Sequence, residues 1–283
     1  MTTEQLRRSL ELLWGEEPRP ARGPRPTLTL DRVVAAATAL ADREGIDALS
    51  MRRVAADLGV GTMSLYRYVP GKAELLALML DRVSDPVECA AGVAPASAAP
   101  AAEISGWRDV LAMVARGTYR MYLRHPWLIQ VNWTRPVMGP NSLAGIELFM
   151  RGLSGLPLTD QERVSLLITL DGFVTGVARQ QVQHAALAGE TGMTDEEFWS
   201  HQAPVLAKAM ESGAYPAMAA LSEDAFGLGW DATFEFGLAR LLDGVAALIE
   251  SRSHSTGTRR RAASRRNADP AEYTVKRGRG RVP

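Results

Sequence analysis

Cysteine, aromatic residues and long apolar runs are all scarce in this chain of 283 residues. Its single cysteine, Cys89, excludes an internal disulfide. No apolar run is long enough to cross a membrane, and no charged and apolar leader precedes the first segments, so we expect a cytoplasmic protein with no membrane partner. No segment alternates apolar and polar residues as a half-buried strand does, whereas helical periodicity recurs along the chain. We therefore predict an all-α fold.

Signatures of catalysis are absent as well. The chain contains no Gly-x-Ser-x-Gly, no phosphate-binding glycine loop and no His-Glu-x-x-His. His125, His184 and His201 stand in no recognised catalytic setting, and His125 precedes a proline at a predicted helix end, where a cation complements the helix dipole. We predict that the chain is not an enzyme and uses no metal or cofactor. An all-α enzyme is the least favoured alternative.

Charge is unevenly distributed although the formal net charge is zero. Residues 19–72 carry 9 basic and 5 acidic side chains, residues 73–251 carry 11 and 21, and residues 252–283 carry 10 and 2. Basic ends beside an acidic middle indicate a polyanion partner for the ends and another partner for the middle. Solubility alone is the alternative explanation.

Caps and breakers divide the first part of the chain into short helices. Thr29 and Gly45 are placed to begin and end an amphipathic helix of about four turns. Ser50 and Gly59 do the same for a second, shorter helix. A third helix is predicted within VGTMSLYRYV, and a fourth over about 72–84.

The second and third of these helices, joined by a tight glycine-containing turn, describe a helix-turn-helix. Leu65 and Val69 would share the inward face of the third helix. Hydroxyl, thioether, phenol and guanidinium groups cover the rest, and such groups read base edges in the major groove. The reading residues are Thr62, Met63, Ser64, Tyr66, Arg67 and Tyr68, with Arg52 and Lys72 flanking them as phosphate clamps. Tyrosines in the core and a solvated arginine are the alternative.

Residues 49–79, LSMRRVAADLGVGTMSLYRYVPGKAELLALM, resemble the DNA-binding segment of transcriptional regulators of the tetracycline-repressor (TetR) family. The resemblance covers about residues 28–84, and WTRPVMGPNSLAGIELFMRGLSG and DGFVTGV resemble the C-terminal domain of that family. It implies that the eight residues above occupy the DNA-contacting positions, and that a homodimer binds double-stranded operator DNA and a small molecule. Val131 stands where the tetracycline repressor has a metal-binding histidine, which argues against a magnesium-tetracycline ligand.

The acidic second domain could enclose an apolar cavity with a few polar groups that orient a ligand. The apolar candidates are Trp107, Trp127, Trp133, Phe149 and Phe173, and the polar candidates are Arg135, Asp171, Gln180 and His184. Core packing is the alternative for the apolar candidates, and simple exposure to solvent is the alternative for the polar ones. Gly172 and Gly176 share one helix face with small-xxx-small spacing, which favours close contact between subunits.

The sequence therefore predicts a helical protein of two domains. Thr159 with Glu162 and Thr194 with Glu197 have the spacing of capping boxes in the second domain. The last segment has almost no apolar content and is predicted to be disordered. The predicted divisions are an N-terminal helix and Pro/Arg-rich basic arm over 1–27, a three-helix helix-turn-helix DNA-binding domain over 28–84, a Pro/Ala-rich linker over 85–106, a larger helical ligand-binding and dimerisation domain over 107–251, and a disordered basic tail over 252–283.

The function predicted from these features is regulation of transcription. A homodimeric repressor would bind a palindromic operator and be released by a small-molecule effector. A nonspecific nucleic-acid binder driven by the basic tail is the alternative, since arginine-rich tails bind nucleic acid without sequence preference.

Overall fold

A computed structural model of the chain describes residues 1–15, 28–91, 106–132, 135–222 and 224–267. Within these ranges the chain is helical and contains no strand, which confirms the all-α prediction. Trp133, most of the basic arm and most of the linker lie outside them, as do residues 268–283. The helices are α1 (Thr3–Trp14), α2 (Leu30–Glu44), α3 (Met51–Asp57), α4 (Thr62–Tyr66), α5 (Lys72–Val83), α6 (Pro86–Ala91), α7 (Trp107–Arg124), α8 (Pro140–Gly152), α9 (Asp160–Thr191), α10 (Asp195–Glu211), α11 (Pro216–Ala219) and α12 (Trp230–Asn267), with 3₁₀ turns η1 (Ile46–Ala48) and η2 (Pro126–Gln130).

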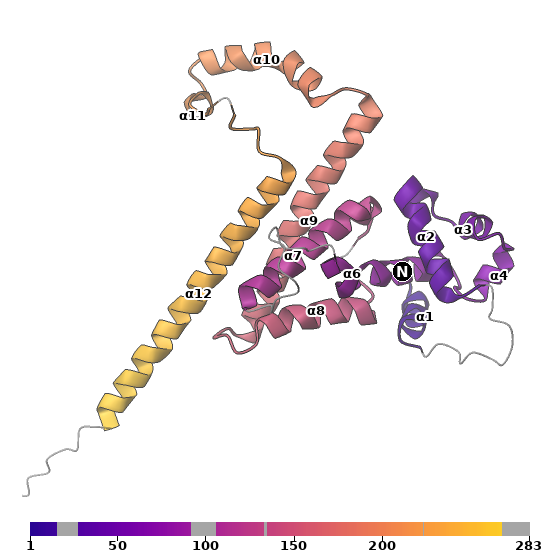
Figure 1. Cartoon of the computed structure of the whole chain (residues 1–283), viewed down its shortest axis with the longest axis horizontal. Coiled ribbons are helices and arrows are strands. Elements are labelled where there is room, and N and C mark those ends of the chain that lie inside the picture. Colours follow the sequence, from indigo (N-terminus) through magenta and orange to yellow (C-terminus); the bar gives the residue numbers. More distant parts are fainter. Residues whose placement is uncertain (16–27, 92–105, 133–134, 223, 268–283) are drawn as a thin grey trace, which may run out of the picture.

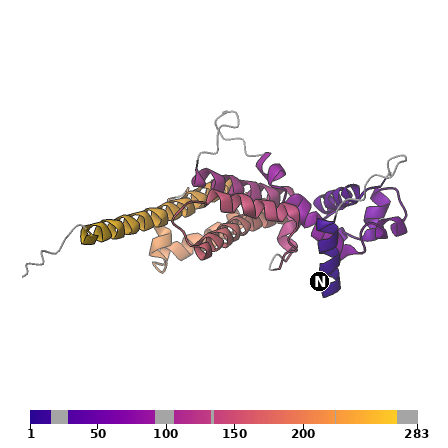
Figure 2. The same cartoon turned by 90° about the horizontal axis from the view of Figure 1, so that it is seen from below.

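Figures 1 and 2 show an elongated molecule with the α2–α4 unit at one end and the last turns of α12 at the other. Helices α6 to α9 and the first half of α12 form the body between them. Helices α10 and α11 connect the end of α9 to the start of α12 and stand away from the body in Figure 1.

The caps predicted for the helix-turn-helix unit are present. The Thr29 hydroxyl accepts a hydrogen bond from the Arg32 amide, and the Ser50 hydroxyl accepts one from the Arg53 amide. Gly45 ends α2 with φ of 81°, a left-handed conformation that favours glycine. The two hydroxyls accept hydrogen bonds from amides that have no partner within the helix, and the glycine allows the chain to turn at the helix end. These helix boundaries therefore follow from local chemistry.

Helix α5 is the connection between the two ends of the molecule. It packs against α1 and α2 on one side and against α8 on the other. The buried Asp81 carboxylate accepts hydrogen bonds from the amide and the hydroxyl of Ser142, each at 2.9 Å, and from the Asn141 amide at 3.3 Å. Asp81 thus caps the first turn of α8. A Cβ on Gly139 would clash with this carboxylate, so glycine is needed at that position.

A second set of contacts joins the N-terminal unit to the end of α7. Asp42 on α2 lies 2.8 Å from Nδ1 of His125 and accepts a hydrogen bond from the Trp127 indole at 2.7 Å. His125 and Trp127 are buried. The N-terminal unit is therefore held by α5 and by this polar contact.

The body of the molecule forms around α7, which contacts α6, α8, α9 and α12. The two predicted capping boxes are present. Thr159 and Glu162 begin α9, and Thr194 and Glu197 begin α10; in each pair, each side chain accepts a hydrogen bond from the other residue's backbone amide. The Tyr119 ring of α7 stacks on Phe234 of α12 with ring centroids 4.1 Å apart. Phe173 of α9 stacks on the same Phe234 ring with centroids 5.7 Å apart, so the core of the body lies between α7, α9 and α12.

Helix is present in two segments where the sequence predicted none. Helix α6 lies inside the predicted linker. It begins where the Asp85 carboxylate accepts a hydrogen bond from the Val87 amide at 2.8 Å. Helix α12 continues to Asn267, through residues 252–267 of the predicted disordered tail. Extending an existing helix avoids the cost of nucleation, and arginine and alanine are good helix formers, so a lack of apolar residues did not end α12.

Candidate DNA-binding surface and internal cavity

The short helix α4 presents an exposed face beside a buried one. Leu65 on α4 and Val69 just after it are fully buried, whereas Met63 is 76% exposed and Tyr66 is 44% exposed. Arg67 follows at the end of α4 and is exposed, and Thr62 and Ser64 are half-buried. Large apolar side chains on a small domain are normally buried, so an exposed methionine and tyrosine beside an arginine indicate a contact surface.

The arginines of α3 and of the ends of α2 and α4 divide into two sets. Arg43 pairs with Asp57 at 3.0 Å and Arg53 pairs with Glu44 at 2.6 Å, which ties α2 to α3. Arg52 and Arg67 are exposed and form no ion pair among the residues that the structure describes. Lys72, also exposed, reaches the Ile46 carbonyl at 3.5 Å. Arg52, Arg67 and Lys72 therefore have no acidic partner in the described chain, and phosphates could take that place.

Tyr68 differs from Tyr66 in its environment. Its ring is half-buried against the core, and its hydroxyl donates to the Leu28 carbonyl at 2.9 Å. This bond ties the end of α4 to the residues that precede α2. The geometry gives Tyr68 a role in positioning α4, beside its predicted place among the DNA-contacting residues.

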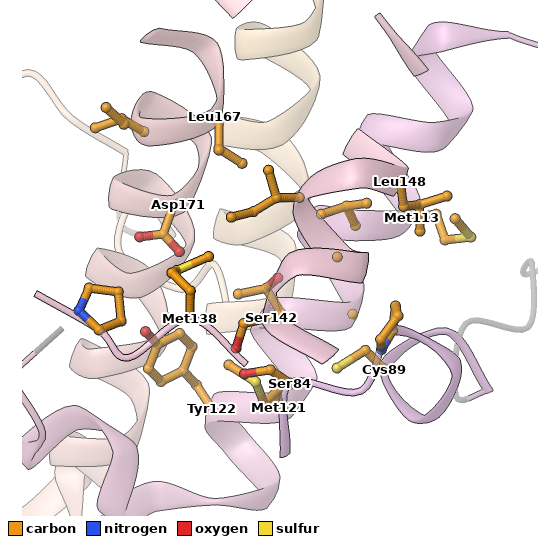
Figure 3. A pocket seen from close by; sticks show the side chains of 18 residues that line it. Ser84, Cys89, Met113, Met121, Tyr122, Met138, Ser142, Leu148, Leu167 and Asp171 are labelled. Atoms are coloured by element: carbon orange, nitrogen blue, oxygen red, sulfur yellow. The ribbon is translucent and has the colours of Figure 1, made fainter. Parts of the chain in front are cut away.

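An internal cavity of about 500 Å³ lies in the body, between α6, α7, α8 and α9 (Figure 3). Most of its lining is apolar, and Met113, Met121 and Met138 contribute three thioethers. Ile168 lines the cavity and is 66% exposed, so the cavity opens to the surface beside α9. The polar lining side chains are Ser84, Cys89, Thr118, Tyr122, Ser142 and Asp171. A cavity of this size and character accommodates a drug-sized molecule.

The surroundings of the cavity shift the pKa values of its titratable side chains. Burial raises the pKa values of the Cys89 thiol, the Tyr122 phenol and the Asp171 carboxyl. The Thr175 hydroxyl donates to the Tyr122 oxygen at 3.2 Å, which partly opposes the effect on Tyr122. Each of these groups is thus easier to keep neutral than it would be in water.

The nine residues predicted for a ligand pocket lie in different places. Asp171 lines the cavity. Trp127 and Phe149 are buried in the core, and Trp107 and Phe173 are half-buried against it. Arg135 and Gln180 are exposed, His184 is exposed beside the Trp230 ring at 5.8 Å, and Trp133 lies outside the described residues.

Sequence reasoning missed the face of α7 that lines the cavity. Met113, Gly117 and Met121 follow one another at four-residue spacing, beside Val114, Thr118 and Tyr122. The opposite face, with Leu111, Ala115 and Tyr119, is buried in the core. The available signal was a second stripe along this helix, beside the apolar core stripe, in which small, polar and methionine side chains alternate. Such a mixed stripe is typical of a cavity wall.

Metal and membrane sites are not evident in the described part of the chain. No group of three or more His, Cys, Asp or Glu side chains there could hold a metal ion. Among the same residues, no helix is both long and apolar enough to span a bilayer.

The α3–α4 unit and the helical body with its cavity define a helix-turn-helix transcriptional regulator. Two family models match the chain: "Bacterial regulatory proteins, tetR family" over residues 33–79 and "Tetracyclin repressor-like, C-terminal domain" over residues 99–249. The chain belongs to the TetR family and is a transcriptional repressor of that family, not an enzyme.

Known relatives agree with this assignment. The chain is 53% identical over 247 residues to the HTH-type transcriptional repressor DrrR1 of Streptomyces coeruleorubidus, a match that covers 87% of this chain and 88% of DrrR1. Apo ActR from Streptomyces coelicolor is similar in structure, with 29% identity, a TM-score of 0.58, and coverage of 82% of this chain and 100% of ActR. ActR in complex with actinorhodin gives 31% identity, a TM-score of 0.59, and coverage of 78% and 97%.

Proposed function

We propose that this repressor binds a two-fold symmetric operator as a cytoplasmic homodimer and is released when a small molecule enters the cavity. The observation that carries the DNA-binding part is the exposed face of α4, where Met63, Tyr66 and Arg67 surround the buried Leu65. Each subunit would place α4 in the major groove of one half-site, and two half-sites would lie about 34–36 Å apart.

Roles for the DNA-facing residues follow from their chemistry. Met63 and Tyr66 offer apolar surface to a thymine methyl, and Arg67 can donate two hydrogen bonds to guanine or grip a phosphate. Thr62 and Ser64 can donate or accept at base edges. Arg52 and Lys72, at the starts of α3 and α5, would bind phosphates on either side and set the register of α4.

Release of the operator by a ligand requires that the cavity and α4 be coupled. Three contacts support such coupling: Asp81 on α5 caps the cavity-lining Ser142, the neighbouring Arg82 pairs with Asp31 on α2, and the Trp14 indole donates to the carbonyl of the cavity-lining Met138 at 2.9 Å. A ligand that displaces this wall would therefore move α5 and α1. Rotation of the N-terminal units would change the α4 spacing and lower operator affinity.

Relatives supply a precedent for the small molecule. ActR has been crystallised with actinorhodin and with (S)-DNPA, so a similar fold binds small ligands. The identity of the ligand does not transfer from ActR at about 30% identity, and the present chain's cavity is defined by its own side chains.

A DNase footprint tests the DNA-binding part of the proposal. Wild type, Tyr66→Ala, Arg67→Ala and a chain lacking residues 252–283 would be compared on DNA upstream of this protein's own gene, or on a site selected from random sequence by the wild type. We expect a bounded, symmetric footprint that Tyr66→Ala or Arg67→Ala weakens by about tenfold or more. The chain without the tail should keep it.

Arg151→Ala is the matched control for Arg67→Ala, because it removes one exposed arginine from α8, far from α4 in the sequence. Its footprint should equal that of the wild type. Diffuse protection that survives Tyr66→Ala and disappears with the tail would instead support a nonspecific nucleic-acid binder.

A further inference from the structure

Among the described residues that line the cavity, a single side chain is charged at neutral pH. It is Asp171 on α9, since the other titratable groups of this described lining are the thiol of Cys89 and the phenol of Tyr122. Figure 3 shows Asp171 among Met138, Tyr122 and Leu167. The remaining lining residues are apolar or carry neutral hydroxyls. The described lining therefore presents one negative charge within a mostly apolar wall.

No cation of the described chain neutralises this carboxylate. Asp171 has no hydrogen bond or ion pair with any described residue, and burial is the single cause of its raised pKa. Arg135 is exposed and does not line the cavity, although it precedes the lining residue Pro136. Arg179, two turns further along α9, lowers the pKa of Tyr122 and does not act on that of Asp171.

Asp171 is exposed toward the mouth of the cavity and its carboxylate has no cation beside it, so a bound cation would gain an attraction that no described protein group supplies. We infer that the ligand of this cavity is an apolar molecule that carries a basic amine, and that its ammonium group pairs with Asp171. The inference rests on the proposed ligand-binding role of the same cavity. A carboxylate ligand would meet like charge at Asp171, and a neutral one would leave the charge unpaired.

The rest of the lining suits such a ligand. Three methionines provide flexible, polarisable surface that adapts to a ring system. The Tyr122 ring also lines the cavity, and an ammonium group near an aromatic face gains further attraction. Asp171 lies on the same face of α9 as Ile168 and Leu167, so the ammonium would bind close to the mouth of the cavity.

The test measures binding of matched probes to the full chain in the absence of DNA, by titration calorimetry at neutral pH. The probes are 9-(methylaminomethyl)anthracene, its neutral N-acetyl derivative, and 9-anthraceneacetic acid. We expect the amine to bind at least about tenfold more tightly than either control. Asp171→Asn should remove this preference, and Asp171→Glu should retain part of it.

Asp160→Asn is the matched control, because it makes the same change on the same helix at a side chain that is 95% exposed. It should leave all three affinities unchanged. Equal binding of the amide or the acid, no binding of the amine, or an unchanged amine affinity in Asp171→Asn would each overturn the inference.

Operator release is measured separately on the same samples. An amine that binds through Asp171 without displacing the operator would contradict the proposed regulation and leave the ligand class standing. Operator release by other ligands, with no preference for the amine, would contradict the ligand class and leave the regulation standing.

Discussion

Single residues in this protein differ sharply in what they do, even when they are neighbours of the same type. Tyr66 is exposed, whereas Tyr68, two residues later, is half-buried and bonded to the Leu28 carbonyl. The same division separates Arg52 from Arg53, since Arg53 is paired with Glu44 and Arg52 has no partner in the described chain. Residue type therefore indicates a candidate for DNA contact. The environment of the side chain decides whether the residue supports the fold or lies on the contact surface.

Asp171 allows a prediction about stability at the residue scale. Its pKa is raised by folding, so its contribution to stability is fully present below the unfolded pKa, near 3.8, and is lost as pH rises through the folded value. The charged side chain thus destabilises the protein slightly at neutral pH when no ligand is bound, since its exposure to solvent limits the effect. We expect Asp171→Asn to raise the free energy of unfolding at pH 7, with the gain shrinking as pH falls toward 4.

Urea denaturation between pH 8 and about pH 4 measures this difference. The other titratable lining groups, Cys89 and Tyr122, have raised pKa values and stay neutral across that window. A variant less stable than the wild type at pH 7, or a difference that does not change with pH, would contradict the prediction.

At the scale of elements, α5 carries the connection between DNA-binding unit and cavity. Asp81 and Arg82 are adjacent on it, and one bonds to the start of α8 while the other bonds to the start of α2. Helix ends leave amides without partners, so a buried carboxylate at the start of α8 is a strong local cap.

Removing that cap should weaken the fold. Asp81→Ala leaves the Ser142 amide and hydroxyl without their acceptor in a part-buried site, so we expect a loss of about 1–3 kcal/mol in the free energy of unfolding. Asp81→Asn should lose less, because its amide oxygen still accepts. Urea denaturation of both variants checks the order, and equal stability of wild type and Asp81→Ala would contradict the role of the cap.

At the scale of the whole molecule, much apolar surface remains uncovered in the single chain. Ile168 on α9, Phe198 and Trp199 on α10 and Phe236 on α12 are all large and exposed. Gly172 and Gly176 lie on an exposed face of α9, and a Cβ on either would meet no atom within 4 Å. Contact with a second subunit would cover some of these side chains, which supports the proposed homodimer.

Gly176 offers a test of that dimer. Glutamate favours a helix over glycine and finds open space here, so Gly176→Glu should leave the single subunit at least as stable. In a dimer that packs on this face, the larger charged side chain would separate the subunits. We expect wild type and Gly176→Ala to sediment as dimers and Gly176→Glu to sediment as a monomer; an unchanged dimer of Gly176→Glu would place the interface elsewhere.

What the sequence alone determined are the features set by local chemistry. Thr29, Ser50, Thr159 and Thr194 begin helices because their hydroxyls accept amides that the helix leaves open. The glycine-bounded turn and the period of Leu65 and Val69 were enough to predict the helix-turn-helix. The resemblance to the TetR family, confirmed by the family models, followed from the same residues.

Only the tertiary structure decided which side chains line the cavity and which fill the core. Trp127 and Phe149 are in the core because their large apolar areas gain most from full burial, whereas smaller and more flexible side chains of α7 and α8 are left to face the cavity. Helical spacing is identical in the two cases, so it cannot distinguish them. Asp171 was named from its sequence, and its isolation from every described cation became visible only when the helices around it were in place.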